Sequence, residues 1–272
     1  MRRFAWTVPA FAFALAGAPC AADDLRLGAT HTLEDSGVLT VLVHAFTKAT
    51  GIPVRPLVAG TGQVMKYAEN GDVDIVFTHS RRDEERLVAR GIGLARADVM
   101  WNDFVIAGPR ADPAGVRGER DAALALKRIR ASGAKFVSRG DDSGTHRKEM
   151  ELWMAGGGLT PWSGYIASGQ GAGRTLTMAH ELDAYDLADR ATLRQLSRRF
   201  PLAILVEGDP RLLNEYGVTT LKPASTRAVR TREADAFARW LVSREAQGLI
   251  AGYRVEGERA FYLPGETRSA AR

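Results

Sequence analysis

The sequence is poor in the residues that build disulfides and metal centres. It contains one cysteine, Cys20, and five histidines in 272 residues. A single cysteine excludes both an intramolecular disulfide framework and a cysteine-based zinc site. The histidines show neither H-x-x-x-H nor H-E-x-x-H spacing, so a metal cation would require His31, His79 and His146 to meet in a cleft. We therefore expect no metal cation and no cofactor.

Neither sign of charge dominates the chain, which has 37 Lys+Arg against 32 Asp+Glu. Nucleic-acid-binding proteins usually carry a clustered basic stripe, so this small surplus predicts no nucleic-acid partner and is compatible with a small anionic ligand. Hydrophobic residues make up 45% and charged residues 25%, which is ordinary for a soluble globular protein. After the first 22 residues no apolar run is long enough to span a bilayer.

The N-terminus has the pattern of an export signal. Arg2 and Arg3 precede an apolar run over 4–18, and Cys20-Ala21-Ala22 offers a small-x-small cleavage site. The run is shorter than a membrane anchor requires. A lipoprotein signal acylated at Cys20 is disfavoured by the proline before it, and the arginine pair resembles the twin-arginine signal only loosely. We expect residues 1–22 to be a signal peptide, and the mature protein to be periplasmic.

Strand and helix patterns alternate along the remaining chain. The expected strands are 25–29, 52–58, 73–77, 104–108, 134–138 and 202–206. The expected helices are 38–50, 63–70, 83–90, 121–132, 143–154, most of 185–199, and 233–251. This alternation predicts an open, mostly parallel α/β sheet with helices on both faces.

The length suits two α/β lobes. We expect lobe 1 to comprise 23–104 plus 221–272 and lobe 2 to comprise 105–220. A ligand would then bind in the cleft between the lobes, outside the carboxyl ends of the strands.

Three segments rich in glycine and hydroxyl side chains each follow an expected strand and precede an expected helix. They are 30–37, 60–63 and 138–146. Helix N-termini present free N–H groups and the positive end of the helix dipole, which favour a bound anion. Arg139 adds a forked, permanently charged donor. Each segment taken alone is more typical of ordinary helix capping than of a binding site. Together they favour an oxyanion site.

The segment 138–146 also permits a hydrolase hypothesis, in which Ser143 and His146 act with Asp141 or Asp142. Proximity in the sequence does not establish a triad, and the G-x-S-x-G pattern is absent from this segment. We expect the two aspartates instead to cap the helix or to orient Arg139.

The segment 138–146, which reads S-R-G-D-D-S-G-T-H, resembles the signature of the tungstate-binding protein (TupA-like) family. Members of this family are periplasmic solute receptors of tungstate ABC importers. The segments 60–63, 99–105, 169–173 and 205–210 also resemble family segments, so the resemblance runs in order along nearly the whole mature chain. Two departures stand out. Trp101 replaces a tyrosine, and the first loop reads Thr-His-Thr-Leu over 30–33 where the family usually has T-T-T-S.

The resemblance implies a two-lobed type II periplasmic-binding-protein fold that closes on one tungstate or molybdate ion. It implies a monomeric binding protein, not an enzyme, whose partner is the membrane permease of an ABC importer. The residues expected to bind the anion are Thr30, His31, Thr61, Arg139, Ser143, Gly144 and Thr145. Phosphate or sulfate remains an alternative ligand, and a sensor remains an alternative role. Phosphate keeps a proton at neutral pH and would require an acceptor in the site.

Overall fold

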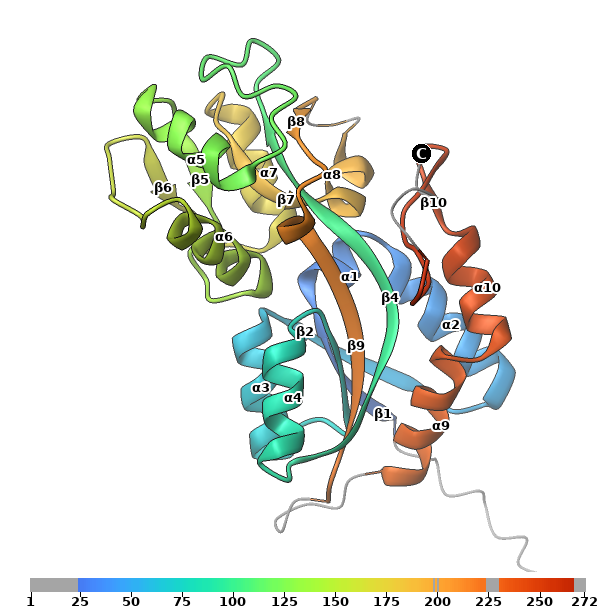
Figure 1. The fold of residues 1–272 in the computed structure, drawn as a ribbon. Coiled ribbons are helices and arrows are strands. Elements are labelled where there is room, and N and C mark those ends of the chain that lie inside the picture. The colour runs from blue at the N-terminus through green and yellow to red at the C-terminus, as the bar shows by residue number, and fades with distance from the viewer. Residues whose placement is uncertain (1–23, 198, 200, 224–229, 267–272) are drawn as a thin grey trace, which may run out of the picture.

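The computed structural model describes residues 24–197, 199, 201–223 and 230–266, which form two lobes joined by two long strands (Figure 1). The predicted signal peptide, residues 1–22, lies outside the described residues. Within those residues, none of the helices has the length and apolar character needed to cross a membrane.

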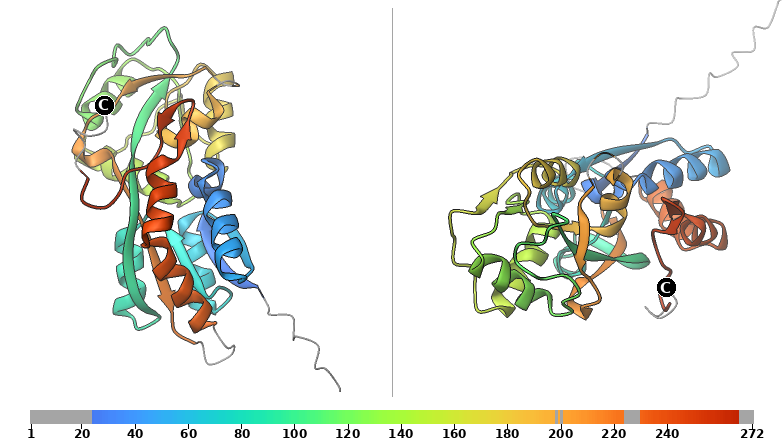
Figure 2. Two further views of the ribbon diagram at one scale, coloured as in Figure 1. Left: turned by 90° about the vertical axis from the view of Figure 1, so that its right-hand side faces the viewer. Right: turned by 90° about the horizontal axis from the view of Figure 1, so that it is seen from above.

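Lobe 1 is built on three parallel strands, with β1 (Leu25–Thr30) between β2 (Val54–Ala59) and β3 (Ile75–Thr78). Helices cover both faces of this sheet. One face carries α2 (Val38–Thr50), α9 (Thr231–Leu241) and α10 (Arg244–Gly252), and the other carries α3 (Thr61–Asn70) and α4 (Arg81–Ala89). Figure 2 shows α2 beside α9 and α10. A separate apolar core fills each side of the sheet.

Lobe 2 has the same layered plan. The parallel strands β5 (Phe136–Ser138) and β6 (Tyr165–Ala167) lie beside β7 (Asp186–Asp189), which together with β8 (Ala203–Val206) pairs antiparallel with β4 (Gly93–Gly108). The helices are α5 (Ala122–Ala131), α6 (Gly144–Ala155), α7 (Ala172–Glu181) and α8 (Arg190–Leu196). Alternate residues of β4 serve the two cores, because Phe104 and Ile106 face α5 and α6 while Val105 and Ala107 face α7 and α8.

The lobes are joined by β4 and β9 (Leu213–Leu221), which we call the crossing strands. They pair antiparallel from Gly93 opposite Leu221 to Asp103 opposite Leu213. β9 also pairs antiparallel with β3, so the sheet is mixed rather than mostly parallel. β4 continues beyond this pairing into lobe 2, where it pairs with β7 and β8, and the residue boundaries of the lobes stay a prediction.

Three short elements complete the described chain. They are α1 (His31–Asp35), the 3-10 turn η1 (Pro210–Leu212), and a hairpin of β10 (Arg254–Val255) and β11 (Glu258–Arg259).

Most expected elements are present within two residues of their predicted ends, but three expectations were wrong. The strand expected at 104–108 begins at Gly93, because its first half carries charged residues and two register shifts that hide the strand pattern. The segment 185–199 starts with β7, whose two aspartates are unusual in a strand. The helix expected over 233–251 is two helices, since Ser243 caps α10 by accepting a hydrogen bond from the Ala246 amide.

Phe46 tests the core between α2 and α9. Its ring lies 4.9 Å from that of Phe237 and 5.6 Å from that of Trp240, and it is fully buried. We expect Phe46→Ala to lower the free energy of unfolding by about 3–5 kcal/mol, because it removes buried contacts and leaves a cavity. Val41→Ala on the same helix, at a side chain 37% exposed, is the control. Urea unfolding measures both changes, and equal effects would contradict the assignment of this core.

Candidate functional site

The first predicted loop forms the helical turn α1 at the carboxyl end of β1. Thr30 is the N-cap residue, and its buried hydroxyl lies 3.1 Å from the hydroxyl of Thr32. Leu33 points into the apolar core of lobe 1 and is fully buried. Leu33, which stands where the family usually has a serine, therefore contributes to the packing of this core.

The second predicted loop is the first turn of α3. Gly60 is the N-cap residue and Thr61 is the first residue of the helix, so the helix begins two residues earlier than predicted. Thr61 is fully buried, and its hydroxyl accepts a hydrogen bond of 3.1 Å from the amide of Gly144. This bond joins lobe 1 directly to the N-terminus of α6 in lobe 2.

The third predicted loop connects β5 to α6. Gly140 has φ +60°, and a Cβ there would lie 2.8 Å from the Cβ of Ala167, so the turn requires glycine. Ser143 is the N-cap of α6 and accepts a hydrogen bond of 3.3 Å from the amide of His146. The residues 143–146 are therefore fixed by local capping, as the sequence predicts.

Arg139 lies almost completely buried at the lobe interface, with 2% of its surface exposed. Its Nε donates to the carbonyl of Gln170 at 2.7 Å, and its Nη2 donates to the carboxylate of Asp141. Asp141 also accepts from the amide of Ser143 at 3.1 Å. Burial alone would raise the pKa of Asp141, but the charge of Arg139 and these hydrogen bonds hold that pKa below its usual value. An ionised Asp141 thus orients Arg139, as predicted.

The N-terminus of α7 also lies at this interface, and the prediction of site residues missed it. A Cβ on its N-cap residue, Gly171, would lie 3.6 Å from the ring of His31. The amide of Gly173 donates to Asp35 of α1 at 3.1 Å across the lobes. The glycine-rich segment 169–173 could have indicated this helix N-terminus, because it has the same kind of sequence as the three loops that were chosen.

Four helices therefore point their N-termini into the interface, α1 and α3 from lobe 1 and α6 and α7 from lobe 2. Among the described residues, the N-cap residues of α1, α3 and α7 make no side-chain capping hydrogen bond, although Asp35 accepts from the Gly173 amide in the first turn of α7. Thr145 adds a buried hydroxyl for which the described residues provide no hydrogen-bond partner. Uncapped N–H groups, the positive ends of helix dipoles and a buried guanidinium are features that favour a bound anion.

His79 lies at the interface, against Gly144 at the start of α6, and was not among the predicted site residues. A Cβ at Gly144 would lie 2.7 Å from its Cε1 atom, so α6 approaches this ring closely only because residue 144 is glycine. Burial lowers the pKa of His79 to about 4, which leaves the ring neutral at pH 7. Its position after β3 gave no sequence signal beyond a histidine at the end of a strand.

A buried polar cluster on the crossing strands holds His79 in place. Asp189 accepts hydrogen bonds from Asn102, Asn214 and Tyr216 at 2.7–3.0 Å. The amide nitrogen of Asn214 donates to Asp189 and to the side-chain oxygen of Asn102. The amide oxygen of Asn214 therefore lies on the other side, 2.8 Å from Nδ1 of His79, and accepts a hydrogen bond from that nitrogen. The cluster thus connects α8 of lobe 2 through both crossing strands to the end of β3.

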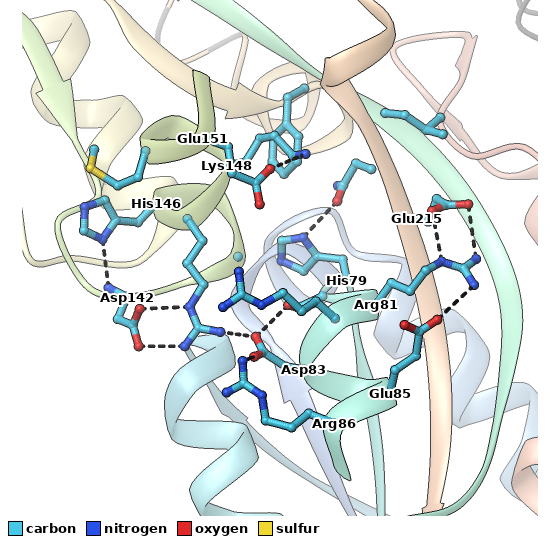
Figure 3. A pocket seen from close by; sticks show the side chains of 18 of the residues that line it. His79, Arg81, Asp83, Glu85, Arg86, Asp142, His146, Lys148, Glu151 and Glu215 are labelled. Carbon is cyan, nitrogen blue, oxygen red and sulfur yellow. Dashed lines mark hydrogen bonds and ion pairs between the residues drawn. The ribbon is translucent and has the colours of Figure 1, made fainter. Parts of the chain in front are cut away.

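A crevice of about 900 Å³ opens beside this interface, lined from both lobes by residues that include His79, Asp83, Asp142, Gly144 and His146 (Figure 3). His146 uses its Nδ1 atom to accept from the amide of Asp142 at 3.1 Å. The imidazole is therefore directed at the loop backbone, while the Ser143 hydroxyl caps α6. This pairing differs from the nucleophile–base contact that the hydrolase hypothesis requires. Within the described chain no group of three or more His, Cys, Asp or Glu residues is arranged to hold a metal ion.

The predicted site residues all come from the four N-termini or from the loop before α6. Thr61 and Gly144 are joined by a hydrogen bond, and the His31 ring lies beside Gly171 at the start of α7. Arg139 is linked to Ser143 through Asp141, which accepts hydrogen bonds from both residues. Their assignment as ligand-binding residues stays a prediction.

The described fold and sequence match known binding proteins. Residues 16–245 match the PBP superfamily domain. The chain is 41% identical over 248 residues to the tungstate-binding protein TupA of Peptoclostridium acidaminophilum, covering 90% of this chain and 86% of that protein. Among solved structures, the tungstate-binding protein TupA of Desulfovibrio alaskensis G20 has 41% identity and a TM-score of 0.75, covering 89% of this chain and 99% of that one. The structure described as the tungstate ABC transporter from Geobacter sulfurreducens has 41% identity and a TM-score of 0.78, covering 85% and 99%.

These matches confirm the two-lobed periplasmic-binding-protein fold expected from the sequence. The chain belongs to the PBP superfamily and, within it, to the TupA family of tungstate-binding proteins.

Proposed function

We propose that this protein is a periplasmic receptor that captures tungstate between its two lobes and delivers it to the permease of an ABC importer. The observation that carries the proposal is that the N-termini of α1 and α7 and those of α3 and α6 are in contact across the lobes, in the region that also holds the buried Arg139. The names of the relatives support the identity of the anion, since TupA proteins of similar sequence are tungstate-binding proteins.

In this proposal the anion is held by hydrogen bonds and by the charge of Arg139, and no covalent bond is made or broken. Arg139 supplies positive charge, while Thr30, Thr61, Ser143, Gly144 and Thr145 supply backbone N–H or hydroxyl donors, and His31 a ring N–H. The unpartnered buried hydroxyl of Thr145 supports this role, because buried hydroxyl groups usually have a partner.

The carboxylates of the loop favour a fully deprotonated oxyanion over phosphate. Both oxygens of Asp141 already accept hydrogen bonds from its own loop, and Asp142 is turned toward Arg147. A protonated phosphate would need a free acceptor at these positions, whereas tungstate does not. Molybdate has the same charge and shape, and the same donors would accept it.

The direct test is a thermal-shift and calorimetry panel on the mature protein with tungstate, molybdate, sulfate, phosphate and chromate. A ligand that binds only the folded state raises the melting temperature with its concentration. We expect stabilisation by tungstate, alone or together with molybdate, and none by sulfate or phosphate. Absence of any shift with all five anions would contradict the proposal.

Arg139→Gln tests the buried charge. We expect it to weaken tungstate binding more than tenfold, because a hydrogen bond to a charged group contributes about 1.5–3 kcal/mol. Arg174→Gln is the matched control, since Arg174 lies in the first turn of α7 but is exposed. Calorimetric titration compares the dissociation constants. Equal weakening by both substitutions would indicate a general charge effect and would remove Arg139 from the site.

Gly144→Ala tests the close approach of α6 to His79. The added methyl group would lie 2.7 Å from the His79 ring, and relieving such overpacking costs about 1–3 kcal/mol. Because this contact joins lobe 1 to lobe 2, we expect tungstate binding to weaken roughly five- to hundredfold on that estimate. Gly248→Ala on α10 is the control, since its Cβ would meet no atom within 4 Å. Unchanged affinity in Gly144→Ala would show that the lobes need not meet there.

A further inference from the structure

Arg147 links the two lobes outside the proposed anion site. It lies in the first turn of α6 in lobe 2, and its Nη1 donates to the carboxylate of Asp83 on α4 of lobe 1. Its Nε and Nη2 atoms bind both oxygens of Asp142, at 2.8 and 2.7 Å. Figure 3 shows Asp142 and Asp83 pointing toward each other from the two lobes, joined by dashed lines through one guanidinium.

The backbone of the loop is arranged to present this link. Asp142 has φ +56°, a left-handed conformation that is uncommon for a residue other than glycine. A Cβ at Gly62 in the first turn of α3 would lie 2.7 Å from Asp142 and 3.4 Å from Arg147. The paired side chains therefore press against the backbone of lobe 1, and glycine at position 62 makes room for them.

The environment of Asp83 distinguishes this link from an ordinary surface ion pair. Exposed pairs contribute little, because water screens the charges. The side chain of Asp83 is only 5% exposed and that of Arg147 is 33% exposed. Asp83 also accepts from the Ser80 hydroxyl at 2.6 Å, and Arg86 of its own helix lies 3.5 Å away. Asp83 is thus held in place by lobe 1, and Arg147 joins it to lobe 2.

We propose that Arg147 is a positioning residue that latches the closed receptor by pairing with Asp83, and so slows release of the bound oxyanion without touching it. The inference rests on the proposed function. An interaction that exists only in the closed state stabilises that state alone, so it shifts the equilibrium between open and closed forms by its full free energy. The pairs of Arg147 with Asp142 and of Asp83 with Arg86 each lie within one lobe and persist in both states.

The experiment measures the rate of tungstate release from the native mature protein and from three variants by rapid mixing with excess molybdate or chelating competitor. We expect Arg147→Gln and Asp83→Asn each to speed release about tenfold, the effect of one lost charged hydrogen bond. Arg86→Gln is the matched control, because it removes the arginine that pairs with Asp83 inside lobe 1. We expect it to release tungstate at the native rate.

A double variant, Arg147→Gln with Asp83→Asn, separates the latch from a general loss of stability. If the two residues act through one bond, the double variant releases tungstate no faster than either single variant. We also expect the ligand-free melting temperature of Arg147→Gln to stay near the native value. The acceleration should shrink at high salt, because ions screen the pair in the native protein.

Native release rates in both single variants, or equal acceleration by Arg86→Gln, would overturn the latch while leaving the receptor proposal intact. Additive effects in the double variant would also overturn it. Failure of the native protein to bind tungstate would overturn the proposed function, and the latch with it.

Discussion

The structure depends on an electrostatic constraint, namely that four helix N-termini meet at one interface. Each N-terminus carries a partial positive charge, and Arg139 adds a full charge. Lobes arranged in this way repel one another unless negative charge lies between them. Asp141 supplies part of that charge beside Arg139, and Asp35 supplies another part at the start of α7. A bound dianion would supply the rest, which couples closure of the lobes to capture of the ligand.

The crossing strands make this arrangement possible because they carry the polar cluster between the lobes. Asp189 collects the hydrogen bonds of Asn102, Asn214 and Tyr216 in a site without exposure to water. A buried cluster in which every member has a partner fixes a unique geometry. His79 is oriented by this cluster and lies against Gly144, so the crossing strands and the proposed anion site share one set of contacts.

The sequence predicts the lobed α/β fold well where the local pattern is strong, as in α2 and β1. It fails where a tertiary contact decides the structure. Asp189 at the end of β7 accepts hydrogen bonds from Asn102 of β4 and from the Thr192 amide of α8, and no local propensity indicates these contacts. The loops around Thr61, Arg139 and Ser143 were predicted from hydroxyl groups and glycine before helices. The roles of His79, Asp35 and Arg147 depend on contacts between residues 64 to 138 positions apart, which a single sequence does not reveal.

The pairing of β4 with β9 also determines how the lobes can move. Two strands hydrogen-bonded side by side bend easily out of their common plane, but sliding one along the other would break every bond of the ladder at once. This pairing permits the lobes to rotate relative to one another by bending of β4 and β9, while the register between the two strands stays the same. A fixed register keeps the same atoms of α3 and α6 opposite one another, so in the proposed receptor each closure would recover the same binding geometry.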